Sequence, residues 1–127
     1  MEKEKSLPLA IEFFAWGHMY TGYLEVGNYS YGEGIAVELW FESEDGLEPY
    51  ASLTVNLPNP CCNGNRAYVD TNNFPEAIGL LEKYRLAAPT GRMGFSGFCV
   101  YPEYEFDLEE IEKYRIFPYD EETEAAV

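Results

Sequence analysis

The chain has 127 residues, of which 46% are hydrophobic and 17% aromatic. It is therefore long enough for one domain with a packed core and too apolar to remain disordered. Its 23 acidic residues outnumber 8 basic ones and give a formal net charge of −15. Because nucleic-acid binding rests on Lys and Arg that neutralise phosphates, this charge argues against a direct nucleic-acid partner and favours a basic protein.

Cysteine usage and the N-terminal segment predict the compartment. Three cysteines leave an odd thiol if two of them pair, which is typical of a reducing cytoplasm. The first apolar stretch is short and interrupted by Glu12, so it predicts neither a signal peptide nor a membrane span. We expect a cytoplasmic protein with a single domain over 1–127, an ordered core over about 7–118 and a mobile acidic tail over 119–127.

The first half of the chain predicts two hairpins. Residues 8–16 and 19–26 alternate apolar side chains with a period of two around a turn at 16–18. The same period returns over 35–41 and 51–57.

The loop of the second hairpin decides its register. A two-residue turn at Asp45-Gly46 mixes buried and exposed faces, whereas a three-residue loop over 44–46 pairs Val37 with Leu53. We therefore expect the longer loop.

A strand over 66–69 and a helix over 74–85 follow, joined by the segment Asp-Thr-Asn-Asn. Asn73 can cap the helix, and Glu76 stands three residues later, as in a capping box. The segment thus contains what a strand-to-helix junction needs, and we interpret it as structural rather than as a functional signature. The residues of this junction are Asp70, Asn72, Asn73 and Glu76.

The remaining elements are short. Residues 87–97 are interpreted as a loop, 98–101 and 104–106 as two strands separated by a proline, and Asp107 and Glu110 as caps of a brief helix. The predicted fold class is α+β. It consists of a twisted antiparallel sheet of five or six strands, with one main helix packed on one face and a short C-terminal helix.

Four segments, "YASLTVNLP", "AYVDTNN", "LLEKYRLAAPTGR" and "SGFCVYPEYEFD", occur in an order that resembles a family of small uncharacterised proteins. The family is a domain of unknown function from gut Firmicutes and their conjugative elements, and the resemblance covers about residues 33–108. Family members often have Cys at the position of Phe74, and they vary around Val100 and Glu103, which argues against a metal or thiol site there. The resemblance implies an intracellular accessory protein of mobile DNA and carries over no catalytic residue.

The chemistry of a catalytic or metal site is poorly represented. Only His18, Cys99 and Asp70 imitate a base, a thiol and an orienting acid, and their spacing does not predict that they meet. One histidine and the adjacent Cys61 and Cys62 lack zinc-ligand spacing. We therefore expect no enzyme activity, no metal and no cofactor.

Arg92 is a lone guanidinium in the predicted loop over 87–97. We expect it to pair with Asp70 or another acid at the helix junction as a structural pin. A ligand contact is the alternative.

Aromatic side chains give the main binding signal. Phe14 and Trp16 are predicted on the face opposite the first strand's apolar side, and Trp40 and Tyr23 on the corresponding face of their strands. If a helix covers only the other face, these side chains form an exposed patch; if both faces are covered, they form a second core. The patch would be rimmed by acids, which suits a partner with a basic rim.

From these features we expect a non-enzymatic protein-interaction or accessory module of a bacterial mobile element. The alternative is an acidic nucleic-acid mimic that inhibits a host DNA-binding or defence protein. A binder of small molecules or glycans on the aromatic face comes third.

Overall fold

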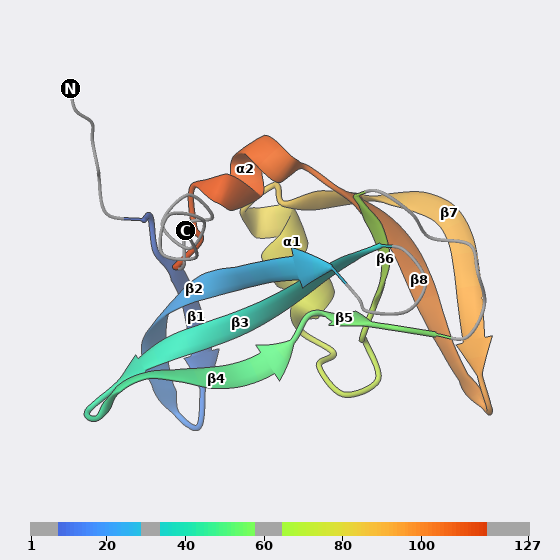
Figure 1. Ribbon diagram of the computed structural model, residues 1–127. Helices are drawn as coiled ribbons and strands as arrows, with labels where there is room; N and C mark the ends of the chain where they lie inside the picture. Colours follow the sequence, from blue (N-terminus) through green and yellow to red (C-terminus); the bar gives the residue numbers. More distant parts are fainter. Residues whose placement is uncertain (1–7, 29–33, 58–64, 117–127) are drawn as a thin grey trace.

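The computed structural model describes residues 8–28, 34–57 and 65–116, and it contains two four-stranded antiparallel sheets (Figure 1). Sheet A has the strand order β1-β2-β3-β4, and sheet B has the order β5-β6-β8-β7. The strands of sheet A are β1 (Ile11–Ala15), β2 (His18–Asn28), β3 (Ile35–Ser43) and β4 (Gly46–Ser52). The strands of sheet B are β5 (Thr54–Val55), β6 (Arg66–Val69), β7 (Ala87–Ser96) and β8 (Cys99–Phe106). The two helices are α1 (Ala77–Lys83) and α2 (Leu108–Glu112).

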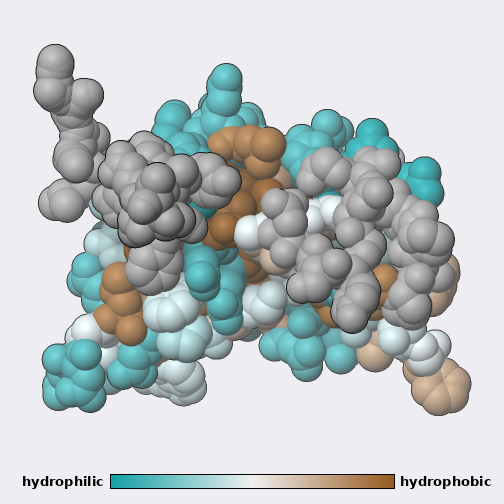
Figure 2. All heavy atoms as spheres, viewed as in Figure 1, coloured by the Kyte–Doolittle hydropathy of each residue, from teal (hydrophilic) through white to brown (hydrophobic). Residues whose placement is uncertain are grey.

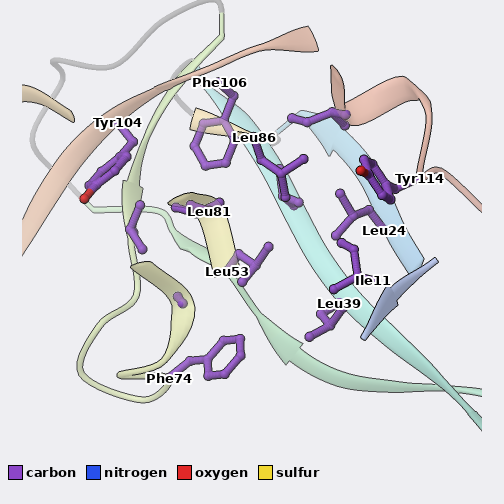
Figure 3. Close-up of a cluster of buried hydrophobic side chains, with 14 of the residues drawn as sticks. Ile11, Leu24, Leu39, Leu53, Phe74, Leu81, Leu86, Tyr104, Phe106 and Tyr114 are labelled. Carbon is purple, nitrogen blue, oxygen red and sulfur yellow. The ribbon is translucent and has the colours of Figure 1, made fainter. Parts of the chain in front are cut away.

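The predicted single sheet with a main helix is therefore wrong, because the strands form two sheets, and 58% of the described residues are in strands and 12% in helices. Both sheets and both helices contribute side chains to one core, which Figure 3 shows in close-up. Among them are Leu24 and Leu39 of sheet A, Leu81 of α1, Phe106 of sheet B and Ile111 of α2. The tail over 119–127 and the pair Cys61-Cys62 lie outside the described residues.

A switch at Leu53 explains why the strands separate into two sheets. The Leu53 N–H still donates to the Val37 carbonyl of β3 at 2.8 Å, but the Leu53 carbonyl accepts from the Asp70 N–H, beyond β6, at 2.9 Å. The Val37 N–H donates instead to the Thr54 side-chain oxygen at 3.1 Å. A side chain thus replaces a backbone partner, and the chain leaves sheet A and enters sheet B without an unsatisfied buried group.

The β3–β4 hairpin reaches the expected register by a different route. Its turn has two residues, since Ser43 pairs with Gly46, so the predicted three-residue loop is wrong. A bulge at Tyr50 then shifts the register, and Leu39 faces Ala51. Tyr50 in the bulge takes the place of the additional residue that the predicted three-residue loop would have contained, so both routes give the same register.

The predicted loop over 87–97 is also wrong, because residues 87–96 form β7, an edge strand. Its partner β8 runs through Pro102 without a break. Pro102 lies just beyond the last β6 contact of β8, which joins Tyr68 to Glu103. On that side no strand of the described sheet requires the N–H that proline lacks.

At the junction before α1, the predicted capping bonds of Asn73 and Glu76 do not form, and Asn73 donates hydrogen bonds instead of accepting one. The helix begins at Ala77 with Glu76 as N-cap, and the Glu76 side chain makes no capping bond. Asn73 is a donor: its N–H and its side-chain amide each lie 3.1 Å from a carboxylate oxygen of Asp70. Asp70, which is buried, therefore closes the turn that leads into the helix, while Asn72 is exposed.

The predicted Asp107 cap of the second helix is confirmed, whereas the Glu110 side chain accepts from Lys113 Nζ and makes no capping bond. The Asp107 carboxylate accepts from the N–H groups of Glu109 and Glu110, each at 3.1 Å. This carboxylate fixes the point at which β8 passes into α2.

Candidate functional site: an acidic and aromatic face of sheet A

One face of sheet A points away from the core and is called the outer face here. It carries aromatic, apolar and acidic side chains from all four strands. The outer face includes the side chains of Glu12, Phe14, Met19, Tyr23, Glu25, Glu38, Trp40, Glu42 and Leu47. As the alternation predicted, Phe14 lies opposite the buried side chains of Ile11 and Phe13.

The apolar end of the outer face lies on β1 and β2. Phe14 and Met19 are directly paired across the two strands, and their side chains are 66% and 62% exposed. Leu47 of β4 is also exposed, but it pairs with Glu42 of β3 and lies two strands away from Met19. An exposed apolar pair such as Phe14 and Met19 is typical of a binding surface.

Tyr23 and Trp40 form the central pair of the outer face. They lie opposite each other on β2 and β3, and both are half-buried. The Tyr23 hydroxyl donates to Glu42 Oε2 at 2.8 Å, and Trp40 Nε1 donates to Glu25 Oε1 at 3.0 Å. The bond to Glu42 raises the pKa of Tyr23. Both rings are thus held in fixed orientations by acids of the neighbouring strand.

Glu25 and Glu38 are paired across β2 and β3 beside these rings. Partial burial raises the pKa of Glu38, and the charge of Glu25 raises it further. Like charges directly opposite each other destabilise a sheet. Among the described residues, the ion pairs of Arg92, Lys113 and Arg115 are formed with acids of β8 and α2, so this pair of carboxylates has no cationic partner there.

Trp16 lies on the other side of the sheet, although the alternation predicts it beside Phe14. It occupies a two-residue turn in which Trp16 and Gly17 both have positive φ, +49° and +80°. Its ring packs edge-on against Tyr20 at 5.7 Å and Tyr50 at 5.2 Å between ring centroids. The turn therefore directs the side chain towards the core side of the sheet.

Around Trp16 lies a group that we call the inner aromatic cluster. Its members are Phe13, Trp16, Tyr20, Phe41, Tyr50 and Phe74. Burial raises the pKa of Tyr50, with a smaller effect from the charge of Glu76. The cluster joins β1, β2, β3 and β4 to the segment before α1. We therefore interpret its rings as part of the packing that holds the fold together.

Arg92 pairs with Glu103 rather than with Asp70, since its Nε lies 3.8 Å from Glu103 Oε1. The Glu103 side chain is fully buried and accepts from Thr90 Oγ1 at 2.6 Å. Thr90 and Arg92 lie where the register of β7 and β8 shifts. The bulge thus surrounds a buried carboxylate, which supports a structural pin at a different place from the predicted one.

The three residues weighed as a triad have separate partners. His18 contacts Tyr20 at the end of sheet A. Cys99, on β8, hydrogen-bonds with Tyr101 and raises the pKa of that tyrosine. Asp70 binds Asn73. The structure therefore gives no support for a thiol site built from them.

No group of three or more His, Cys, Asp or Glu side chains within the described residues is arranged to hold a metal ion. None of the described helices is both long enough and apolar enough to cross a membrane.

Sequence reasoning missed a second exposed surface at the end of the β7–β8 hairpin. Met93, Phe95, Phe98 and Val100 all have exposed side chains there. The missed signal was a strand pattern around Gly97: an uncharged stretch over 93–102 with apolar residues at 93, 95, 98 and 100.

Comparison with known proteins identifies a protein family. A family model described as domain of unknown function DUF4313 matches residues 23–124. No curated protein and no solved structure matches. Tyr23, Trp40 and Arg92 fall inside the match, whereas Phe14 and Trp16 precede it. The expected resemblance to a domain of unknown function is thus confirmed, and the chain belongs to the DUF4313 family.

Proposed function

We propose that this chain is a non-enzymatic protein-binding module, and that the outer face of sheet A binds a basic protein surface. The observation that supports this most is the Glu25–Glu38 pair, two opposed carboxylates with no ion-pair partner among the described residues. Such a pair raises the energy of the free protein, and a cationic side chain from a partner relieves the repulsion.

Tyr23 and Trp40 support the same proposal. Protein interfaces depend on a few aromatic anchors surrounded by a polar rim. The rings lie next to the opposed carboxylates, and hydrogen bonds to Glu25 and Glu42 hold them in place before any partner arrives. Less ordering is then needed on binding.

The charge of the surrounding chain supports a basic rather than an acidic partner. Residues 6–65, which include all of sheet A, contain eight acids and no Lys or Arg. A basic partner is attracted over the whole face, and the attraction weakens as salt is added.

The cellular setting is also part of the proposal. The family resemblance suggests an accessory protein of a bacterial mobile element that works in the cytoplasm. A protein that accompanies mobile DNA meets DNA-binding proteins, which have basic surfaces.

A nucleic-acid mimic remains the second candidate, because a net charge of −15 also suits a surface that replaces phosphates. The two candidates differ in how the binding energy is distributed. A mimic loses affinity in small additive steps as each acid is neutralised, whereas an anchored interface depends on one or two rings.

The test begins with affinity purification from the native host and identification of the partner by mass spectrometry. Surface plasmon resonance with that partner, which gives both the affinity and the association rate, then compares Trp40→Ala with Glu12→Gln, Glu38→Gln and Glu42→Gln at low and high salt. We expect Trp40→Ala to cost more than about 2 kcal/mol of binding free energy. Each glutamine variant should mainly slow association.

Phe98→Ala is the matched control, because it removes an exposed ring from the β7–β8 hairpin of sheet B and leaves sheet A unchanged. A thermal melt of each variant checks that the fold is intact. Normal binding by Trp40→Ala together with additive losses in the glutamine series would refute the anchored interface and favour the mimic.

A further inference from the structure

The β7–β8 hairpin ends in an apolar arm, defined here as residues 93–102. Figure 1 shows the two strands extending together to the lower right, and Figure 2 shows apolar atoms at that end. The exposed fractions of its apolar side chains are 50% for Met93, 58% for Phe95, 105% for Phe98 and 44% for Val100. These values are high for side chains of this kind.

The two faces of the arm differ. Phe95 pairs with Val100, so these side chains share one face, and Met93 lies two residues before Phe95 on the same side. On the other face, Gly94 lies so close to Tyr68 and Leu57 that an added Cβ would clash with both side chains. One face is therefore anchored to the protein, and the other is free.

The arm also differs from the rest of the chain in charge. Residues 93–102 contain no Asp, Glu, Lys or Arg, in a protein with a net charge of −15. The nearest charges along the chain, Arg92 and Glu103, pair with each other. The arm is thus a place where a second acidic molecule can approach without meeting unpaired acids of the hairpin.

We propose that two copies of this chain associate through the free faces of their arms. A phenylalanine side chain can bury roughly 150–250 Å². Because Phe98 is fully exposed and Phe95 is 58% exposed in the free protein, the two rings can bury about 300 Å² in each copy. A symmetric contact doubles this area to about 600 Å², and Met93 and Val100 bring the total close to the roughly 1,000 Å² that a weak but specific interface requires. The same patch contacts itself, so no other surface is needed.

This association predicts an unusual dependence on salt. The net charges of two copies repel each other, and added salt screens that repulsion. Self-association through an uncharged patch should therefore strengthen as salt is raised. Binding of a basic partner to the outer face of sheet A should weaken, so the two proposals can fail independently.

Sedimentation velocity of the full chain, from micromolar to millimolar concentration and at low and high salt, tests the proposal. We expect a monomer–dimer equilibrium that shifts to dimer with concentration and with salt. Phe95→Ser and Phe98→Ser should each weaken it by roughly tenfold or more. Phe14→Ser is the matched control, because Phe14 is as exposed as Phe95 but lies on sheet A, and it should dimerise like the wild type.

Three results would overturn the proposal. The wild type could remain monomeric at millimolar concentration in high salt, or Phe14→Ser could weaken the dimer as much as the arm variants do. A monomeric wild type that floats with phosphatidylcholine vesicles would show that the arm meets a lipid surface instead. Unchanged melting temperatures of the serine variants ensure that a lost dimer is not a lost fold.

Discussion

Two turns of this molecule each combine one glycine with one aromatic residue, and they do opposite things with the ring. Trp16, before Gly17, is 67% exposed, yet its ring contacts three other rings of the inner aromatic cluster. Phe98, after Gly97, is fully exposed and has no ring contact among the described residues. Exposure alone therefore does not separate a structural aromatic residue from a binding one.

The order of the two residues contributes to this difference. In the first turn both residues have positive φ, as in a type I′ turn, and Trp16 is bent back over the cluster. In the second turn only Gly97 does, with φ +61°, which matches a type II′ turn. No aromatic cluster lies beneath Phe98, so its ring stays in solvent.

The largest expected effect comes from removing a buried ring of the inner aromatic cluster, to which Trp16 belongs. Phe13 is buried and lies 4.8 Å from the Tyr50 ring. Phe13→Ala should lower the free energy of unfolding by about 3–5 kcal/mol. Phe98→Ala should change it by no more than about 0.5 kcal/mol. Urea melts of both variants measure the contrast, and equal losses would contradict it.

Trp16 itself should fall between these limits. Trp16→Ala removes three edge contacts that are partly open to water, and we expect a loss of about 1–2 kcal/mol in the free energy of unfolding. A chemical melt with tyrosine fluorescence measures this loss. If the Trp16→Ala variant is as stable as the wild type, the Trp16 ring does not stabilise the fold, and Trp16 then resembles Phe98.

A second substitution at the same site separates the backbone from the ring. Asn, unlike Ala, accepts a positive φ and is favoured before Gly in a type I′ turn. Trp16→Asn should therefore be more stable than Trp16→Ala by about 1 kcal/mol, although both lose the ring. Identical melts of the two variants would show that the turn adapts to alanine without strain.

The smallest expected change in stability comes from the outer face of sheet A, where paired carboxylates rather than aromatic rings determine the energy. The pKa of Glu38 is raised, so its protonated form favours the folded state and stability is lost as pH rises through that pKa. Glu38→Gln should stabilise the protein by about 0.2–1 kcal/mol at neutral pH, because it removes the repulsion from Glu25.

This gain should disappear at pH values below the ordinary carboxylate range, where Glu38 is protonated in the wild type as well. Melting temperatures of both proteins from about pH 2.5 to pH 7, a range that extends below the ordinary Glu pKa of about 4.3, provide the measurement. A variant less stable than the wild type at neutral pH would mean that Glu25 and Glu38 do not repel each other.

The alternation of side chains predicted most strands, because it depends only on neighbours in sequence. It correctly placed Ile11 and Leu39 inside and Phe14 outside. It could not predict two sheets, because the apolar period runs unbroken across Leu53 while the hydrogen-bond partners change there. That change depends on Asp70, a residue distant in sequence.

The candidate site was predictable to the same extent. Tyr23 and Trp40 were placed correctly by their strands, and the Glu25–Glu38 pairing then followed from the register between β2 and β3. Trp16 was misplaced because a turn, rather than a strand, orients it. Asn73 was predicted to accept a hydrogen bond, but it donates to Asp70. An Asn side chain can do either in a turn, so its sequence position does not decide between the two roles.

The crossing at Leu53 also bears on how the protein opens. Two sheets that pack on each other in a single chain can often fluctuate separately if a loop joins them. Here one buried residue donates its N–H to sheet A and accepts through its carbonyl from the segment after β6. Separation of the sheets breaks both bonds and exposes the shared core, so the sheets should exchange their protected amide protons together, in one global opening.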